Sequence, residues 1–263
     1  MEEALFITKI EDFKHIKTSY SRLYFGNEFC EHLIPNVEVL TAVLERCKDK
    51  NMALSVVTPF VTDAGIEKLK KILDFLRIKE VDLEIVINDF GVLDLVQSEK
   101  YDFNLVLGRL LSRQKRDSRI DVVSNKLPAG LKQHFSFCYL DREEIIELLL
   151  DFGIKRIELD NLSSGIRRSQ NRRLKASLYY PYAYISTTRL CPARKIFKKN
   201  FHLRLVEDCN KECRHGNMIL KNKSIPYDII LKGNTYFRYI DKLPLDLDVL
   251  GIDRIIYQPE IPL

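Results

Sequence analysis

The 263-residue chain is predicted to adopt an α/β fold, a (βα) barrel that is irregular or incomplete and carries a cysteine-bearing insertion. Two observations support this prediction. Short segments rich in β-branched residues alternate with amphipathic helical patterns, which is typical of parallel βαβ units. The length also matches the roughly 250 residues of a single α/β barrel. The chain has no tandem repeat and no obvious flexible linker, so we expect one domain over residues 1–263 with the insertion at 187–215.

Short apolar runs mark the predicted strands in the first two thirds of the chain. Ala53–Thr58 is followed by Pro59, and Asp82–Asn88 is followed by Asp89, so each run ends at a turn-forming residue. Similar runs occur at Arg22–Phe25, Asn104–Leu107, His134–Leu140 and Arg156–Leu159.

Three segments between these strands repeat their apolar residues at helical spacing. They are Val37–Cys47, Ile66–Leu76 and Asp141–Asp151. Asn36 is placed to cap the first helix, because its side chain can accept a hydrogen bond from an amide of the first turn. In the third helix, Ile145, Leu148 and Leu149 are expected to face the core, and Gly153 is expected to end the helix.

The pattern changes after about Lys175. Ala176–Ser186 is aromatic and strand-like but is interrupted by Pro181, whereas Cys191–Arg214 has weak periodicity and predicts an irregular, basic excursion. Further strand candidates follow at Ile229–Lys232, Tyr236–Ile240 and Arg254–Tyr257. These features place the insertion in the C-terminal third of the chain.

The composition and the first residues of the chain indicate the cellular compartment of the protein. No run reaches the roughly 18 apolar residues that a membrane span needs. The chain begins with acidic residues, Glu2 and Glu3, where a signal peptide would be basic. We therefore expect a cytoplasmic protein without a membrane span. Thiols stay reduced in that compartment, so the six cysteines indicate metal binding or catalysis in preference to disulfides.

Three cysteines in the C-terminal third have the spacing of a metal site. Cys209 and Cys213 form a C-x3-C pair, and Cys191 lies upstream of it. A tetrahedral zinc site or a cuboidal iron–sulfur cluster needs a fourth ligand. The candidates for this ligand are Cys30, Cys47, Cys138, His202 and His215. Spacing leaves open a structural zinc site, an iron–sulfur cluster or unrelated thiols.

The candidate cysteines differ in their surroundings. Cys47 lies on the apolar face of a predicted helix, and Cys138 lies within a predicted strand, so both are expected in the core. Cys30 lies in the loop that follows the strand-like Arg22–Phe25. Loops at the carboxyl ends of barrel strands are where functional groups collect.

Six segments form an ordered set along most of the chain. They are Leu23–Cys30 (LYFGNEFC), Val86–Gly91 (VINDFG), Leu107–Leu111 (LGRLL), Arg156–Asn161 (RIELDN), Thr187–Pro192 (TTRLCP) and Cys209-x3-Cys213. This set resembles the collagenase-like peptidase family of unassigned catalytic type, the U32 peptidases, and is most similar to its UbiV-like iron–sulfur branch. The resemblance implies a βα-barrel-like fold. It also implies a 4Fe–4S cluster, whose ligands on the matching positions are Cys30, Cys191, Cys209 and Cys213.

The resemblance carries an expectation about function as well. It implies oxygen-independent hydroxylation of a quinone precursor or of RNA, by this chain alone or in a heterodimer with a related barrel subunit. Two alternatives stay open. One is a collagenase-like peptidase with structural or catalytic cysteines, and the other is a non-catalytic subunit that bears the cluster for a partner.

Two polar residues at predicted strand ends are candidate catalytic groups. Asp89 and Arg109 follow neighbouring strands, so a barrel would place both at the mouth that also holds Cys30. Asp89 could act as an acid or base or orient Arg109, and Arg109 could pair with a carboxylate of the substrate. The alternative is structural: Asp89 caps a helix, and Arg109 forms a salt bridge. Glu158 and Asp160 occupy a comparable strand end.

Basic residues gather near the cysteines although the net charge is only +5. One group forms a run: Arg167, Arg168, Arg172 and Arg173. A second group flanks the cysteines: Arg189, Arg194, Lys195 and Arg214. The run can contact RNA phosphate, or it can lie on a solvated or partner-facing surface. The second group can make the insertion soluble, screen a cluster or receive an anionic small molecule.

Overall fold

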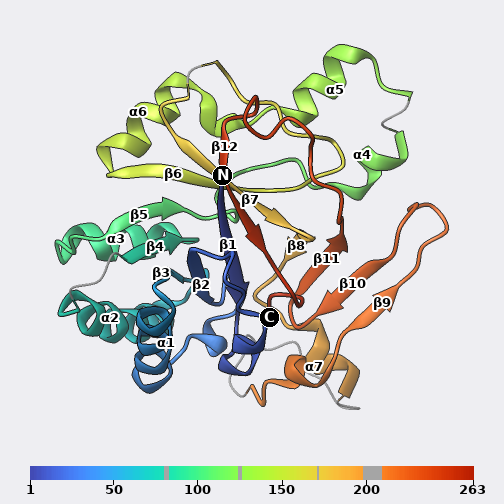
Figure 1. Cartoon of the computed structure of the whole chain (residues 1–263). Coiled ribbons are helices and arrows are strands. Elements are labelled where there is room, and N and C mark those ends of the chain that lie inside the picture. The colour runs from blue at the N-terminus through green and yellow to red at the C-terminus, as the bar shows by residue number, and fades with distance from the viewer. Residues whose placement is uncertain (80–82, 124–125, 171, 198–208) are drawn as a thin grey trace.

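A computed structural model describes residues 1–79, 83–123, 126–170, 172–197 and 209–263. Eight parallel strands close into a barrel in the order β1-β12-β7-β6-β5-β4-β3-β2, which confirms the predicted α/β barrel (Figure 1). These strands are β1 (Glu2–Ile7), β2 (Arg22–Gly26), β3 (Ala53–Val57), β4 (Leu83–Ile87), β5 (Asn104–Leu107), β6 (Ile154–Asp160), β7 (Lys175–Tyr180) and β12 (Ile252–Tyr257).

The helices form an irregular outer ring. They are α1 (Val37–Lys50), α2 (Asp63–Arg77), α3 (Phe90–Ser98), α4 (Ser118–Val123), α5 (Ala129–Ser136) and α6 (Glu143–Asp151), whereas α7 (Pro192–Phe197) lies outside this ring, in the excursion between β7 and β12. A short 3-10 turn, η1 (Ile10–His15), takes the place of a helix after β1, and the described residues between β6 and β7 contain none. The helical part of the barrel is therefore incomplete.

Most of the expected local structure is present. The Asn36 side chain accepts a hydrogen bond from the Val39 amide at 3.0 Å and caps α1. Gly153, at φ +77°, follows α6 in the left-handed region that glycine tolerates. The inward face of α6 differs from the prediction at one position, because Ile146 and Leu149 are buried whereas Leu148 is 52% exposed. Several apolar faces are possible in this Leu- and Ile-rich helix, and packing against the barrel selects one.

The strand expected at His134–Leu140 is wrong. Residues up to Ser136 belong to α5, and Tyr139–Asp141 form the 3-10 turn η4. The physical reason lies in the barrel, where β5 pairs directly with β6, with Leu107 opposite Ile157. That pairing leaves no position for a strand from the long connection between them.

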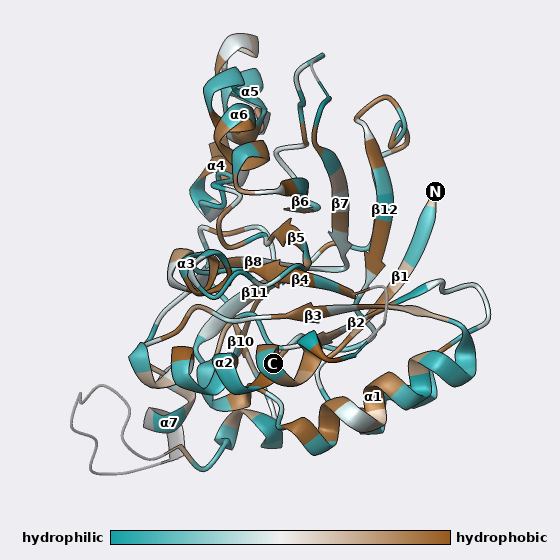
Figure 2. Ribbon diagram, turned by 90° about the vertical axis from the view of Figure 1, so that its left-hand side faces the viewer, coloured by the Kyte–Doolittle hydropathy of each residue, from teal (hydrophilic) through white to brown (hydrophobic). Residues whose placement is uncertain are grey.

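Two apolar layers hold the barrel together. The larger layer fills the space between the strands and the helices, and the strands that contribute to it are largely hydrophobic (Figure 2). The smaller layer lies inside the barrel, where Phe6, Tyr24 and Tyr179 meet edge to face with ring centroids 5.9–6.5 Å apart. Inward and outward side chains alternate along each strand, as barrel geometry requires. None of the helices in the described part of the chain has the length and apolar character of a membrane span.

A second sheet packs on the carboxyl ends of the barrel strands. Its order is β8-β11-β10-β9, from β8 (Tyr182–Thr187), β9 (Met218–Leu220), β10 (Ile229–Lys232) and β11 (Thr235–Tyr239) (Figure 1). Phe29 of the barrel meets Tyr184 and Phe237 of this sheet at centroid distances of 5.4 and 5.3 Å. The expected insertion, 187–215, lies within the longer excursion between β7 and β12, and its residues 198–208 lie outside the described part.

Candidate metal centre

Cys30 is positioned by the sharp turn that follows β2. Gly26 has φ +135°, and a Cβ there would lie 2.2 Å from the carbonyl oxygen of Val57, so only glycine fits. Asn27 then folds the chain back, because its Oδ1 accepts hydrogen bonds from the amides of Phe29 at 3.0 Å and Cys30 at 2.9 Å. The sequence Gly-Asn in this loop therefore directs the Cys30 thiol to one side of the barrel mouth.

The other three cysteines come from the excursion that carries the second sheet. Cys191 precedes α7, which is anchored where the Ala193 amide donates to the carbonyl of Gly233 at 3.2 Å. Cys213 lies in the turn η5 (Glu212–His215), against the same Gly233, because a Cβ on that glycine would be 3.2 Å from the Cβ of Cys213. The β10–β11 turn thus holds two cysteine segments side by side.

All four cysteines line one cavity of about 430 Å³. They are Cys30, Cys191, Cys209 and Cys213. Phe29, Leu33, Phe60 and Leu263 supply apolar walls. Of the other candidates for a fourth ligand, Cys47 and Cys138 are buried in the core as predicted, His215 is exposed, and His202 lies outside the described residues.

Burial raises the pKa of three of the cavity thiols, Cys30, Cys191 and Cys213. The pKa of Cys30 is raised to about 12, mainly by burial, with smaller contributions from the neighbouring cysteines and an opposing backbone hydrogen bond. Burial likewise raises the pKa of Cys213 to about 11, again with a contribution from Cys191. Binding of a metal cation favours the thiolate form of such buried thiols.

The sulfur atoms are not gathered tightly around a single point. No three of the four cysteine sulfurs, all within the described residues, lie within 4.8 Å of one another. Tetrahedral zinc with bonds of about 2.3 Å requires sulfur pairs about 3.8 Å apart. A cuboidal cluster separates its ligands more, since each sulfur binds a different iron.

Cationic and backbone donors surround the cavity. Lys68, Arg189 and Arg194 line it, and the amide of Lys211 donates to the Cys209 sulfur at 3.4 Å. Arg189 is held in place where it donates to the carbonyl of Val61 at 2.9 Å. Such groups stabilise negative charge on a metal–thiolate centre. Of the other flanking residues, Arg214 is exposed, and the side chain of Lys195 lies outside the described part.

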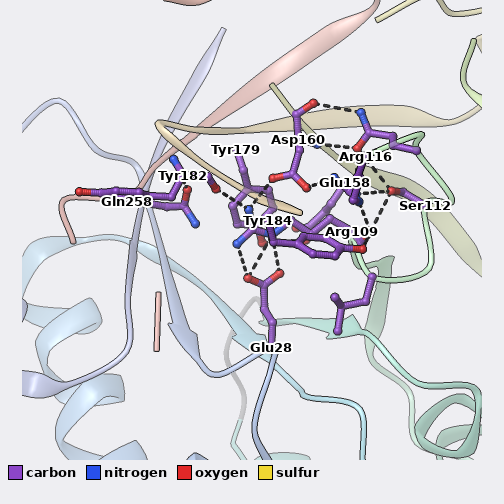
Figure 3. A network of polar contacts seen from close by, with 12 residues as sticks. Glu28, Arg109, Ser112, Arg116, Glu158, Asp160, Tyr179, Tyr182, Tyr184 and Gln258 are labelled. Atoms are coloured by element: carbon purple, nitrogen blue, oxygen red, sulfur yellow. Dashed lines mark hydrogen bonds and ion pairs between the residues drawn. The ribbon is translucent and has the colours of Figure 1, made fainter. Parts of the chain in front are cut away.

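Arg109 is fully buried in the middle of the barrel mouth (Figure 3). It donates three hydrogen bonds to Glu28, the shortest at 2.6 Å, one to Asp160 at 2.6 Å and one to the carbonyl of Tyr182 at 3.0 Å. Its guanidinium stacks 4.1 Å from the ring centroid of Tyr179. These contacts join the carboxyl ends of four barrel strands, β2, β5, β6 and β7, to the second sheet, which is the structural alternative that the sequence left open. A catalytic role for Arg109 stays a prediction.

Asp89 is engaged by the backbone. Its Oδ1 accepts from the Gly91 amide at 2.7 Å and caps α3, and its Oδ2 accepts from the Val61 amide at 3.0 Å. Arg109 is oriented by other carboxylates, so the two predicted catalytic residues do not form a pair through these bonds. The catalytic role of Asp89 stays a prediction, and the observed bonds account for the residue as a cap and a brace between two loops.

The basic run after β6, Arg167–Arg173, makes several contacts within the fold. Arg168 is buried and forms a bidentate pair with Asp141, the shortest bond being 2.8 Å. Arg173 pairs with Glu147, and Arg172 donates to the carbonyl of Val249. Three of the four arginines are thus committed to contacts within the chain, and the run provides no argument for RNA binding. Asn171, within the run, lies outside the described residues.

Glu158 is a further buried carboxylate at the end of a barrel strand. Its Oε2 accepts from the Tyr179 hydroxyl at 2.7 Å, and its buried Oε1 has no hydrogen-bond partner in the described part of the chain. Burial, reinforced by the charge of Glu28, raises its pKa to about 8. The group is therefore protonated at neutral pH in the folded protein.

This shift makes stability depend on pH. Between about pH 4.5 and 8 the folded protein holds a proton that the unfolded chain releases, so the free energy of unfolding falls as pH rises, by up to about 1.4 kcal/mol per pH unit. We expect Glu158→Gln to remove this slope, with urea unfolding curves that match the wild type near pH 4 and show a more stable variant at pH 7. The exposed control, Glu144→Gln, should follow the wild type. Parallel curves for wild type and Glu158→Gln at every pH would contradict this assignment.

Together the fold and the site define an α/β-barrel protein with a four-cysteine cavity at its mouth. No protein-family model matches the chain, and no curated protein matches its sequence. Among solved structures it is similar to the U32 peptidase Mk0906, at 13% identity and a TM-score of 0.51, over 100% of this chain and 94% of that one. It is also similar to the putative copper homeostasis protein CutC from Streptococcus agalactiae, at 13% identity and a TM-score of 0.43, over 68% and 87%. The first of these shows that the fold is shared with a U32 peptidase.

Proposed function

We propose that this chain is an iron–sulfur protein related to the U32 peptidases, with a 4Fe–4S cluster held by Cys30, Cys191, Cys209 and Cys213. The observation that carries the proposal is the convergence of these four cysteines, from three separate segments, on one cavity. Four thiolates are the usual ligand set of such a cluster. The ordered sequence resemblance to the UbiV-like branch is an independent reason to choose iron and sulfide over zinc.

The surroundings of the cysteines fit this group. Apolar side chains form part of the cavity wall around the cysteines. No three of the four sulfurs, each in the described part of the chain, lie within 4.8 Å of one another, a spacing that a centre with several metal atoms accommodates. Lys68 and Arg194 provide positive charge toward the negative cluster. These features support a cluster of several irons without fixing its reduction potential.

The proposed role is oxygen-independent hydroxylation, by this chain alone or beside a related barrel subunit. When bound, the cluster would supply one-electron redox chemistry. The chain itself supplies an open cavity next to the cysteines, with Arg189 and Lys68 at its wall to hold an anionic group of a substrate. A quinone precursor with a carboxylate fits these residues better than RNA, since the basic run is used within the fold.

Metal and sulfide analysis of the protein purified without oxygen tests the proposal. We expect about four irons and an equal amount of acid-labile sulfide per chain, with the broad visible absorption of a cluster that bleaches on reduction. A colourless protein that contains zinc and no iron would overturn it. Cleavage of denatured protein by iron-free enzyme would favour the peptidase alternative. A cluster that forms without turnover until a second barrel subunit is added would favour the partner-subunit alternative.

A further inference from the structure

A second set of metal-binding side chains lies apart from the cysteines. Asp12 and His15 come from η1, the turn that follows β1, and Glu260 comes from the segment that follows β12. One ligand atom from each of the three lies within 4.8 Å of the others. Within the described residues, no other group of His, Cys, Asp and Glu donors meets this criterion. The two segments are joined because β1 and β12 are neighbours in the barrel (Figure 1).

Two of these ligand atoms are buried without hydrogen bonds. Asp12 is only 2% exposed, and its Oδ1 has no hydrogen-bond partner among the described residues. The same is true of Nε2 of His15, which faces Glu260 Oε1 at 3.9 Å. A buried acceptor without a hydrogen bond is unfavourable, and each of these two atoms is met, within the part of the chain that the structure describes, only by a longer ion-pair contact. Their arrangement indicates that a further group belongs between them.

Two exposed lysine side chains, Lys9 and Lys14, lie near the carboxylates of this group. Lys9 Nζ lies 3.6 Å from Asp12 Oδ1 and 3.4 Å from Glu260 Oε2, and Lys14 Nζ lies 3.9 Å from Glu260. The first distance is longer than a hydrogen bond. Both lysines are well exposed, at 44% and 64%, so each can turn into solvent. They compete with a cation for the carboxylates, but neither lysine donates a hydrogen bond to Asp12 Oδ1 or to the imidazole.

We propose that Asp12, His15 and Glu260 form a binding site for a divalent transition-metal cation. Two carboxylates and one neutral imidazole provide three ligands, a set that leaves positions for water and suits Mn²⁺, Fe²⁺ or Zn²⁺. A divalent cation neutralises both carboxylates and satisfies the two orphan atoms at once. The imidazole ligand favours these metals over Mg²⁺ and Ca²⁺, which prefer oxygen.

Such a cation would also stabilise the segment Glu260–Leu263, which forms part of the wall of the cysteine cavity. Glu260 is followed by Ile261, whose carbonyl accepts a hydrogen bond from Lys232 at 2.9 Å. Leu263, in the same segment, lines the cavity and packs with Cys213. A metal that joins Glu260 to η1 therefore holds this segment against the second sheet. The site has its own ligands and does not depend on the cluster.

Titration with Mn²⁺, followed by the loss of its free six-line EPR signal, tests the site. Mn²⁺ is the probe because thiolates bind it poorly, so the cysteines do not interfere. We expect one saturable site per full-length chain, equally present in wild type and in Cys30→Ala. Glu260→Gln and His15→Gln should each weaken binding roughly tenfold or more. The exposed control on the same turn, Glu11→Gln, should bind as the wild type does.

A lysine variant gives a result of the opposite sign. Lys9→Met removes the competing ammonium group and should tighten Mn²⁺ binding roughly fivefold. Both ligand variants change exposed or half-buried side chains, and circular dichroism will show whether they fold. Absence of saturable binding in the wild type would overturn the proposal and leave a bridging water between the orphan atoms. Equal binding by wild type, Glu260→Gln and His15→Gln would overturn it too.

Discussion

Cys30→Ala is expected to abolish the cluster, with iron falling from about four per chain to less than one and sulfide falling in parallel. Cys30 lies more than 160 residues from the next proposed ligand in the sequence, yet it lines the same cavity. Without it a cluster would have one iron open to the cavity and would be lost during purification. The measurement is iron, sulfide and visible absorption of protein prepared under anaerobic conditions.

The matched control is another cysteine that lies in the core. Cys47 is buried in α1, at 2% exposed, but it packs between the helix and the barrel and is not among the described residues that line the cavity. Cys47→Ala should keep the full iron content and lose only the modest packing energy of one sulfur atom. Equal iron in Cys30→Ala and wild type would show that Cys30 is not a ligand. The metal site would then consist of Cys191, Cys209 and Cys213, the three cysteines whose spacing indicates a site.

Arg109→Met is expected to destabilise the fold by about 3–5 kcal/mol, because it leaves buried Glu28 without its cation. Asp160 keeps a partner in Arg116, so the main loss falls on Glu28. This is a large fraction of the 5–15 kcal/mol that a typical domain has. Urea unfolding of wild type and variant, with the metal content held equal, measures the change.

A double-mutant cycle separates the buried pair from other effects. Adding Glu28→Gln to Arg109→Met removes the uncompensated charge and should restore part of the lost stability. Arg119→Ala, which breaks an exposed pair with Asp117, should change stability by less than about 1 kcal/mol. If Arg109→Met were as stable as the wild type and had lost only activity, Arg109 would be a catalytic residue, as the sequence first suggested.

Local features of the chain were predictable because short-range physics controls them. The Asn36 cap needs only an amide three residues away, and the strands at Ala53–Val57 and Asn104–Leu107 follow from runs of buried residues. The wrong strand at His134–Leu140 shows the limit of this approach. Its aromatic composition suits a strand, but the barrel had no free position for one, and that depends on how β5 and β6 pair.

The role of polar residues at strand ends was harder to predict. The sequence placed Asp89 and Arg109 at the mouth, which is correct, but their partners come from distant segments. Arg109 meets Glu28, 81 residues away, and a carbonyl of the second sheet, 73 residues away. Closure of the mouth by that sheet buries Arg109, and nothing in the local pattern reveals the closure. The arginine run is a similar case. Its local pattern suggested solvent-exposed charges, but Arg168 and Arg173 pair with acidic residues of η4 and α6.

Short-range patterns were enough to predict the alternation of strands and helices, the spacing of the three cysteines around Cys191 and the burial of Cys47 and Cys138. Each depends on residues that are close along the chain. Only the tertiary structure brought Cys30 to the other cysteines and Glu260 to η1, 245 or more residues from its partners there. The physical reason is barrel closure. Because β1 pairs with both β2 and β12, loops from opposite ends of the chain lie at the same mouth of the barrel.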